Sequence, residues 1–387
     1  MSNTRLQITL QPQVLQWARE RARLDQETLA RKLSLKTETI QTWERSGEIS
    51  LAQVDRLAHL THTPLGFLYL PEPVCNEVSI PDFRTVGDAT RQYYSPDLIE
   101  TIQTMQRRQD WLRDELIEQG RNPVTLVGSI TTETEPKQSA NILKKQLQLP
   151  TDWAESLTNW TEALRHLKEA IEQAGIIVAI NGIVGNNTHR KLDPSEFRGF
   201  TLVDSYAPLI FINGADAKAA QMFTLIHELA HIGITASGIS NFETLQPIPI
   251  PIEIFCNQVA AEFLVPADAL QDSWNRVLSQ SDNYQPYQLL ARQFKVSSIV
   301  IARRALDLGL INRSMFFAFY QSQMEIKSTK KTGGGDFWKT QNVRIGKAFG
   351  MAVIQAVKEG RLLYREAYAL TGLADKSFEQ FVQKMGA

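Results

Sequence analysis

The chain has 387 residues, of which 43% are hydrophobic and 21% are charged, a composition typical of a soluble globular protein with two or three domains. No apolar run approaches the ~20 residues of a membrane span, and no signal peptide is recognised, so no membrane association is expected. Two cysteines provide no disulfide framework, which favours a cytoplasmic location.

The net charge of −1 is unevenly distributed. Residues 1–70 carry +2, residues 71–312 carry −9 and residues 313–387 carry +6. Basic ends around an acidic centre suit nucleic-acid binding at the ends and not in the middle.

The first 70 residues are predicted to form an all-α domain of short helices. Residues 25–44 resemble a Cro/Xre-type helix-turn-helix, with Ser34 at the position usually taken by a turn glycine. Internal packing would come from Leu29, Ala30, Leu33, Leu35, Ile40 and Trp43. The expected helices are Gln13–Arg23, Gln26–Leu33, Thr37–Ser46, Ser50–Leu60 and a short piece from Pro64.

This resemblance implies that the second helix of the motif enters the major groove of duplex DNA. Lys36, Thr37, Gln41 and Thr42 are then the candidate base readers, and Gln26 and Arg45 lie near phosphates. A homodimer is expected because one such module binds DNA weakly. The alternative is a helical bundle that binds only protein, since a charge of +2 is low for a DNA-binding domain.

A proline-rich linker at residues 71–96 is predicted to separate this domain from the next, because prolines favour extended geometry. The following domain, residues 97–312, is predicted to be a zincin-like α+β fold. Its expected elements are helices at 96–118 and 160–174, a polar stretch at 128–140, and strands at 176–180, 199–203 and 208–212.

The strongest motif is His227-Glu228-Leu-Ala-His231, which lies in a ten-residue stretch free of Gly and Pro. Residues four apart on a helix differ by ~40° in azimuth, so both imidazoles leave the same face and can reach one ion. This is zinc-ligand spacing, with Glu228 as the candidate general base.

A catalytic zinc takes three protein ligands, so a further ligand is needed. A predicted helix at 253–264 offers Glu253 and Glu262, which lie on opposite faces. Glu253 is chosen because Asn257 follows it by one turn, placed to accept an imidazole N–H. Cys256 is close to the same face, where it is expected to be a small buried hydrophobe and, less favoured, a metal ligand.

These residues carry a resemblance to the ImmA/IrrE family of zinc metallopeptidases. The family pattern is HELxH followed by ExxAN-x-FAA-x-LLMP, and Cys256 and Val259 replace its usual Ala and Phe. The matching segments are Phe223–His231, Glu253–Pro266, Ile80–Thr85, Phe197–Phe200 and Pro208–Asn213. The resemblance implies His227, His231 and Glu253 as ligands of Zn²⁺ and Glu228 as the base.

Two parts of the peptidase site are less well defined by sequence. The strand Leu209, Ile210, Phe211 and Ile212 is predicted to be an edge strand that pairs with an extended substrate. The group assisting the oxyanion is left open among His189, Arg198 and Tyr206.

The remaining sequence is predicted to be helical. Residues 289–310 again look like a helix-turn-helix, interpreted as a structural unit that follows the peptidase. Residues 313–387 form a helical C-terminal region, with a flexible break at Gly333–Gly335 and helices at 343–359 and 364–370.

Three functions are compatible with this organisation. The first is a DNA-binding transcriptional regulator whose zinc endopeptidase cleaves a repressor-like protein, as the family resemblance implies. The second is an antitoxin or autorepressor whose zincin domain mainly binds a partner toxin. The third is a DNA-binding sensor gated by a ligand or metal, without proteolysis.

Overall fold

The computed structural model describes residues 6–74, 93–240, 251–280, 286–326 and 343–385. These residues fall into two compact units, of which the first holds residues 6–74 and 93–103 and the second holds the described residues from Thr104 onward. The Ile80–Thr85 match, most of the predicted linker and the Gly333–Gly335 break lie outside the described residues.

The first unit packs four short helices around one apolar core. Its elements are β1 (Gln7–Thr9), α1 (Pro12–Arg21), α2 (Gln26–Leu33), α3 (Thr37–Ser46), β2 (Glu48–Ser50), α4 (Leu51–Leu60) and the 3-10 helix η1 (Leu65–Tyr69). Trp17, Leu29, Ile40, Trp43 and Val54 are buried in its centre. The predicted bounds of α2 and α3 are confirmed.

Two backbone positions fix the turns around α3. Ser34 adopts the left-handed conformation expected for the turn, with φ 57°. Gly47 ends α3 with φ 74°, and a Cβ there would lie 1.9 Å from the carbonyl oxygen of Leu10. Only glycine fits so close to another backbone.

The prediction that this unit is entirely helical is wrong in one respect. β1 and β2 form an antiparallel pair, with Ile8 opposite Ile49. Strands of three residues are too short to show an alternating pattern, and the partner strands are separated by most of the unit.

The second unit is a mixed α+β structure with many helices. Its sheet has the strand order β3-β7-β6-β8, in which β3 and β7 are parallel and the other pairs are antiparallel. The strands are β3 (Ile177–Asn181), β6 (Gly199–Leu202), β7 (Leu209–Asn213) and β8 (Gly238–Ser240), and a separate hairpin contains β4 (Ile183–Val184) and β5 (Asn187–Lys191).

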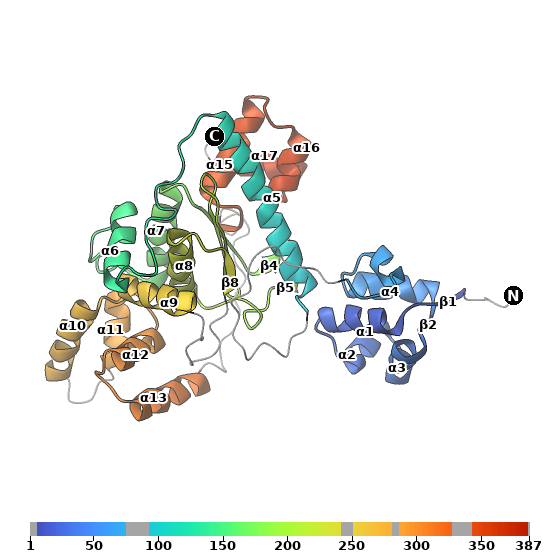
Figure 1. Cartoon of the computed structure of the whole chain (residues 1–387), viewed down its shortest axis with the longest axis horizontal. Coiled ribbons are helices and arrows are strands. Elements are labelled where there is room, and N and C mark those ends of the chain that lie inside the picture. The colour runs from blue at the N-terminus through green and yellow to red at the C-terminus, as the bar shows by residue number, and fades with distance from the viewer. Residues whose placement is uncertain (1–5, 75–92, 241–250, 281–285, 327–342, 386–387) are drawn as a thin grey trace. The chain divides into compact units, whose positions relative to one another are not determined.

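Helices cover this sheet and extend its core. The helix α8 (Lys218–Gly233) packs against β6, β7, α7 (Trp160–Gln173) and α9 (Pro251–Leu264). The core continues into the α10–α13 group, which Figure 1 shows beyond α9. The other helices here are α6 (Pro136–Gln146), α10 (Ala267–Gln280), α11 (Pro286–Phe294), α12 (Ser298–Asp307), α13 (Arg313–Ile326) and, from Thr104 onward, α5 (Pro96–Glu118).

The C-terminal helices are held by hydrogen bonds from earlier elements. They are α15 (Lys347–Lys358), α16 (Tyr364–Thr371) and α17 (Asp375–Lys384). The guanidinium of Arg108 on α5 donates to the carbonyl oxygens of Leu370 and Arg344 at 2.8 and 3.1 Å. The backbone N–H of Lys347 donates to Glu172 of α7 at 2.9 Å. These helices are therefore docked on α5 and α7 within the second unit.

Candidate functional site

The His227–His231 motif lies in the C-terminal half of α8, where every residue from Thr224 to Gly233 is buried. His227, Glu228 and His231 are completely buried. Three buried ionisable groups on one helix require partners, because an uncompensated polar group in a protein interior is costly. The partners come from α9 and from β6.

The α9 helix supplies a carboxylate to both imidazoles. Glu253 Oε2 lies 3.1 Å from His227 Nε2, and Glu253 Oε1 lies 2.9 Å from His231 Nε2. The two Nε2 atoms are 2.9 Å apart. One turn later, Asn257 Oδ1 lies 3.1 Å from His227 Nδ1, which is the outer contact expected from the sequence.

This donor set fits a zinc ion. Two imidazole nitrogens and one carboxylate oxygen are the ligands of many catalytic zinc sites. In a tetrahedral site with bonds of about 2.0–2.1 Å, ligand atoms are roughly 3.3 Å apart. The observed separations of 2.9–3.1 Å are slightly smaller, so a small adjustment would accommodate the ion. His227, His231 and Glu253 form a metal-ligand group in the described part of the chain.

The electrostatics of Glu253 agree with a ligand role. Burial raises the pKa of its carboxyl, but the imidazoles of His227 and His231 outweigh that effect and lower the pKa to about 2. Glu253 is therefore an anion at neutral pH, the form that coordinates a metal.

The alternative ligand Glu262 is committed elsewhere. Its carboxylate forms an ion pair with Arg304 of α12. Arg304 also donates through Nε to the carbonyl oxygen of Val265 at 3.2 Å. Glu262 therefore joins α9 to α12, on the side of the helix away from Glu253, as the helical spacing predicts.

Glu228 has different surroundings from Glu253. Burial raises the pKa of its carboxyl, and the nearby imidazoles of His227 and His231 only partly offset this. Its Oε2 accepts a hydrogen bond from Thr201 Oγ1 of β6 at 2.7 Å. A buried carboxylate with a raised pKa beside a metal-ligand cluster has the properties of a general base.

Cys256 is buried in the core, as the favoured interpretation predicts. Burial raises the pKa of its thiol, while the adjacent His231 partly offsets this. The thiol is absent from the ligand group formed by the described residues. It is therefore a neutral neighbour of His231.

The predicted substrate-pairing strand is wrong. Leu209–Ile212 belong to β7, which is hydrogen-bonded to β3 on one side and β6 on the other, so it has no free edge. All four residues are buried. A continuous apolar run is typical of a central strand, and sequence order does not fix spatial order within a sheet. Among the described strands, β8 lies at the edge beyond β6.

The candidates for oxyanion assistance have other contacts. Arg198 lies 3.4 Å from Asp216 in an ion pair. His189 is exposed on β5, and the backbone N–H of Tyr206 donates to Asp204. None of these contacts involves His227, His231 or Glu253. The structure therefore does not identify which residue assists the oxyanion.

On the first unit, the predicted DNA-contacting residues differ in exposure. Lys36, Gln41, Thr42 and Arg45 are exposed, and Thr37 is half-buried. The Thr42 hydroxyl donates to the carbonyl oxygen of Glu38 within α3. Half-buried Gln26 donates to Glu44 at 2.7 Å.

Sequence reasoning missed three residues beside these sites. Arg19 holds Glu44 through two hydrogen bonds of 2.5 and 3.0 Å, which connects α1 to α3. Thr201 and Gly199 lie beside Glu228. The Phe197–Phe200 match was a signal for this strand, but the contact with Glu228 depends on how β6 packs against α8.

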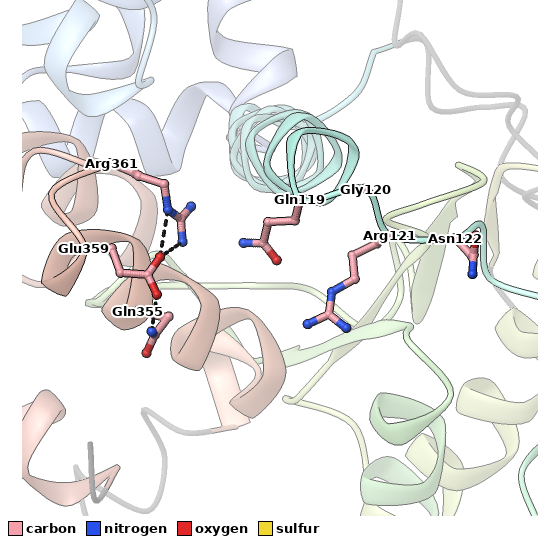
Figure 2. Close-up of a pocket in the computed structure, with 7 residues that line it drawn as sticks. All are labelled: Gln119, Gly120, Arg121, Asn122, Gln355, Glu359 and Arg361. Atoms are coloured by element: carbon pink, nitrogen blue, oxygen red, sulfur yellow. Dashed lines mark hydrogen bonds and ion pairs between the residues drawn. The ribbon is translucent and has the colours of Figure 1, made fainter.

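A polar hollow also lies between the end of α5 and α15 (Figure 2). Arg361 is ion-paired with Glu359 and with Glu115, and Gln355 donates to Glu359. All seven lining residues are exposed, and none is a candidate ligand of the metal site: Gln119, Gly120, Arg121, Asn122, Gln355, Glu359 and Arg361.

A His-Glu-x-x-His helix packed on a sheet and facing a carboxylate from the next helix defines a zincin-like metallopeptidase site. Residues 171–306 match the Peptidase_M78 family, described as an IrrE N-terminal-like domain. This part of the chain is therefore similar to the metallopeptidase-like domains of the ImmA/IrrE type, and the group His227, His231 and Glu253 could hold the zinc on which that family depends. Residues 345–384 match a domain of unknown function, DUF8813.

One curated relative gives a shorter match. The (S)-2-hydroxypropylphosphonic acid epoxidase of Streptomyces wedmorensis is 37% identical over 73 residues, which cover 18% of this chain and 37% of the epoxidase. The chain thus spans about a third of that relative's length. No solved structure matches. No helix in the described ranges is both long and apolar enough to cross a membrane.

Proposed function

We propose that the protein is a DNA-binding transcriptional regulator whose zinc-dependent endopeptidase domain cleaves a repressor or another regulatory protein. The observation that carries this proposal is the convergence of His227, His231 and Glu253 next to the buried carboxylate of Glu228. The family match over residues 171–306 supports the same chemistry.

The proposed reaction is hydrolysis of a peptide bond. Zinc held by His227, His231 and Glu253 would lower the pKa of the attacking water toward ~7 and polarise the scissile carbonyl. Glu228 would take a proton from the attacking water and later pass it to the leaving amine. Asn257 accepts the Nδ1 proton of His227, which keeps the Nε2 lone pair available for coordination.

The proposed DNA-binding role rests on the α2–α3 pair. Lys36, Gln41 and Arg45 are exposed on or beside α3, and the Arg19–Glu44 pair fixes α3 against α1. A rigid helix with exposed polar side chains suits major-groove recognition by a dimer. The first unit would then locate the protein at an operator or near its substrate.

The alternatives differ in whether Glu228 matters. An antitoxin or autorepressor that binds a partner toxin, or a ligand-gated sensor, needs the fold and the DNA-binding unit but not a general base. The complete set of ligands, the base and Asn257 favour the enzyme.

The test combines metal analysis with cleavage of a panel of purified helix-turn-helix repressors by the full-length protein. We expect about one zinc per chain, with large losses in His227→Ala and Glu253→Gln because each removes a ligand. Glu228→Gln should retain zinc but lose cleavage by roughly 10²–10⁴-fold.

Glu262→Gln is the matched control, since it alters the other carboxylate of α9 and should leave zinc unchanged. Unchanged zinc in Glu253→Gln would contradict the ligand assignment. If the wild-type protein binds DNA in a gel-shift assay but cleaves no repressor, the antitoxin or sensor function would be favoured.

A further inference from the structure

The two oxygens of the Glu228 carboxylate have different environments. Oε2 accepts the 2.7 Å hydrogen bond from Thr201. Oε1 is buried and has no hydrogen-bond partner among the described residues. A buried acceptor without a donor is costly, so its retention requires a physical reason.

Thr201 is placed to hold one oxygen in position. It is completely buried on β6, and its hydroxyl is within hydrogen-bond distance of Glu228 Oε2. Its Oγ1 also lies 3.2 Å from the backbone oxygen of Glu228. The side chain therefore contacts both ends of Glu228 and restricts rotation of the carboxylate.

Gly199 leaves space beside the other oxygen. It lies two residues before Thr201 on β6, so both positions are on the same face of the strand. A Cβ on Gly199 would lie 2.9 Å from Glu228 Oε1, 2.8 Å from Thr224 Cγ2 and 3.0 Å from the backbone oxygen of Phe211. The Phe211 oxygen belongs to β7 and cannot move without disturbing the sheet.

We propose that Gly199 and Thr201 are positioning residues for Glu228, a role that rests on the proposed endopeptidase function. Thr201 fixes Oε2, and the missing side chain at Gly199 leaves room for Oε1 to accept a proton from the reacting water. The carboxylate is thus held with one oxygen satisfied and the other available to accept a proton.

The test uses a probe that needs both the metal and Glu228. Acetohydroxamate is added to the cobalt-substituted full-length protein, and its affinity is measured from the visible spectrum of cobalt. A hydroxamate bound to the metal donates its hydroxyl proton to an adjacent carboxylate, so its affinity reports the position of Oε1. Glu228→Gln defines the affinity without this interaction.

We expect Thr201→Val to lower the affinity for acetohydroxamate roughly tenfold or more, because the isosteric side chain loses the hydrogen bond that orients Oε2. Thr201→Ser keeps the hydroxyl and should restore affinity to within about threefold of the wild type. Metal content should be unchanged in both. Rescue by Ser but not by Val distinguishes positioning from packing.

Gly199→Ala should also lower the affinity for acetohydroxamate without loss of metal. The double variant Gly199→Ala, Thr224→Ser lacks the Thr224 methyl group that lies nearest the new Cβ. The new Cβ would still lie close to Glu228 Oε1, so binding of the probe should remain weak. Full recovery in the double variant would show that the alanine acts only through Thr224 and would overturn the role of Gly199.

Two other results separate the proposals. Equal affinities for the wild type, Thr201→Val and Thr201→Ser, with a large loss in Glu228→Gln, would overturn the positioning role and leave the endopeptidase intact. Failure of the wild-type protein to bind cobalt, or no effect of Glu228→Gln, would overturn both.

Discussion

Two buried carboxylates beside the same imidazoles have opposite tendencies to ionise. Contact with His227 and His231 lowers the pKa of Glu253 to about 2, whereas burial raises the pKa of Glu228. Groups whose surroundings move their pKa values apart suit separate roles in acid–base chemistry. Glu253 remains an anionic ligand, and Glu228 can accept a proton.

These residue types were recognisable in the sequence, but the roles of their neighbours were not. Helical spacing alone placed His227 and His231 together and separated Glu253 from Glu262. The contact of Thr201 with Glu228 joins a strand to a helix across 27 residues, and no local pattern encodes it.

A different residue gives a testable dependence of stability on pH. Lys144 of α6 is 4% exposed, and its Nζ lies 5.3 Å from the centre of the Phe263 ring. Burial lowers the pKa of Lys144 to about 8, an effect that Glu262 only partly offsets. Between about pH 8 and the ordinary Lys value of ~10.4, the unfolded chain binds more protons than the folded chain.

The contribution of Lys144 to the free energy of unfolding should therefore rise with pH across that interval, by up to about 3 kcal/mol. Lys144→Met should remove this rise and raise stability at neutral pH. The exposed neighbour Lys145 provides the control, because Lys145→Met should keep the wild-type profile. Urea unfolding at a series of pH values measures the free energy of unfolding of the wild type and of both variants. Parallel profiles for wild type and Lys144→Met would contradict the expectation.

At the scale of elements, sequence periodicity predicted most long helices and the strands β3, β6 and β7 of the sheet, but neither β8 nor which strands are neighbours. α2 and α3 match their predicted ranges, and β7 was predicted as a strand within one residue of its bounds. Its central position depends on pairing with β3 and β6. The polar stretch at 128–140 concealed the start of α6, which begins at Pro136.

One buried arginine contributes to the docking of the C-terminal helices. Arg108 is buried and donates to Leu370 and Arg344. Replacing it by methionine keeps the volume but leaves these carbonyl oxygens without the donor. We expect Arg108→Met to lower the free energy of unfolding by about 2–4 kcal/mol and to speed amide exchange in α16.

Hydrogen exchange followed by mass spectrometry checks this, with Arg107→Met as the control. Arg107 is exposed on the same helix, and its replacement should change stability by no more than about 0.5 kcal/mol. Similar exchange in both variants would show that Arg108 does not hold the C-terminal helices.

The α3 helix offers a prediction about DNA. If Gln41 contacts a base edge, Gln41→Ala should relax sequence preference by ~1–3 kcal/mol at one position of the operator, and wild-type affinity should fall steeply with salt. Gln16→Ala on α1 changes an exposed glutamine outside α3 and should have no such effect. Fluorescence anisotropy over a set of duplexes measures the sequence preference and the salt dependence of the wild type and of both variants. Binding without salt dependence would assign this unit to protein interaction.

For the whole molecule, the distribution of charge is the main constraint that sequence provides. The basic first 70 residues and the basic region after residue 312 flank a centre of charge −9. Opposite charges attract over about a Debye length. The C-terminal helices are already held against α5 and α7, so the competition concerns the first 70 residues, which can associate with the centre or with DNA. The sequence does not determine the balance between them, because it depends on contacts between folded surfaces.

This competition predicts coupling between DNA binding and the peptidase. A peptidase whose proposed substrate resembles its own first unit also needs restraint, because an accessible site would favour self-cleavage. Deletion of residues 1–70 should therefore increase cleavage of a partner repressor, or alter toxin affinity, without changing zinc content. Operator DNA should have the same effect on the full-length protein, since DNA populates the state that binds it better. Cleavage or partner affinity is measured for both proteins, with and without DNA. Identical values in all four conditions would show that the units act independently.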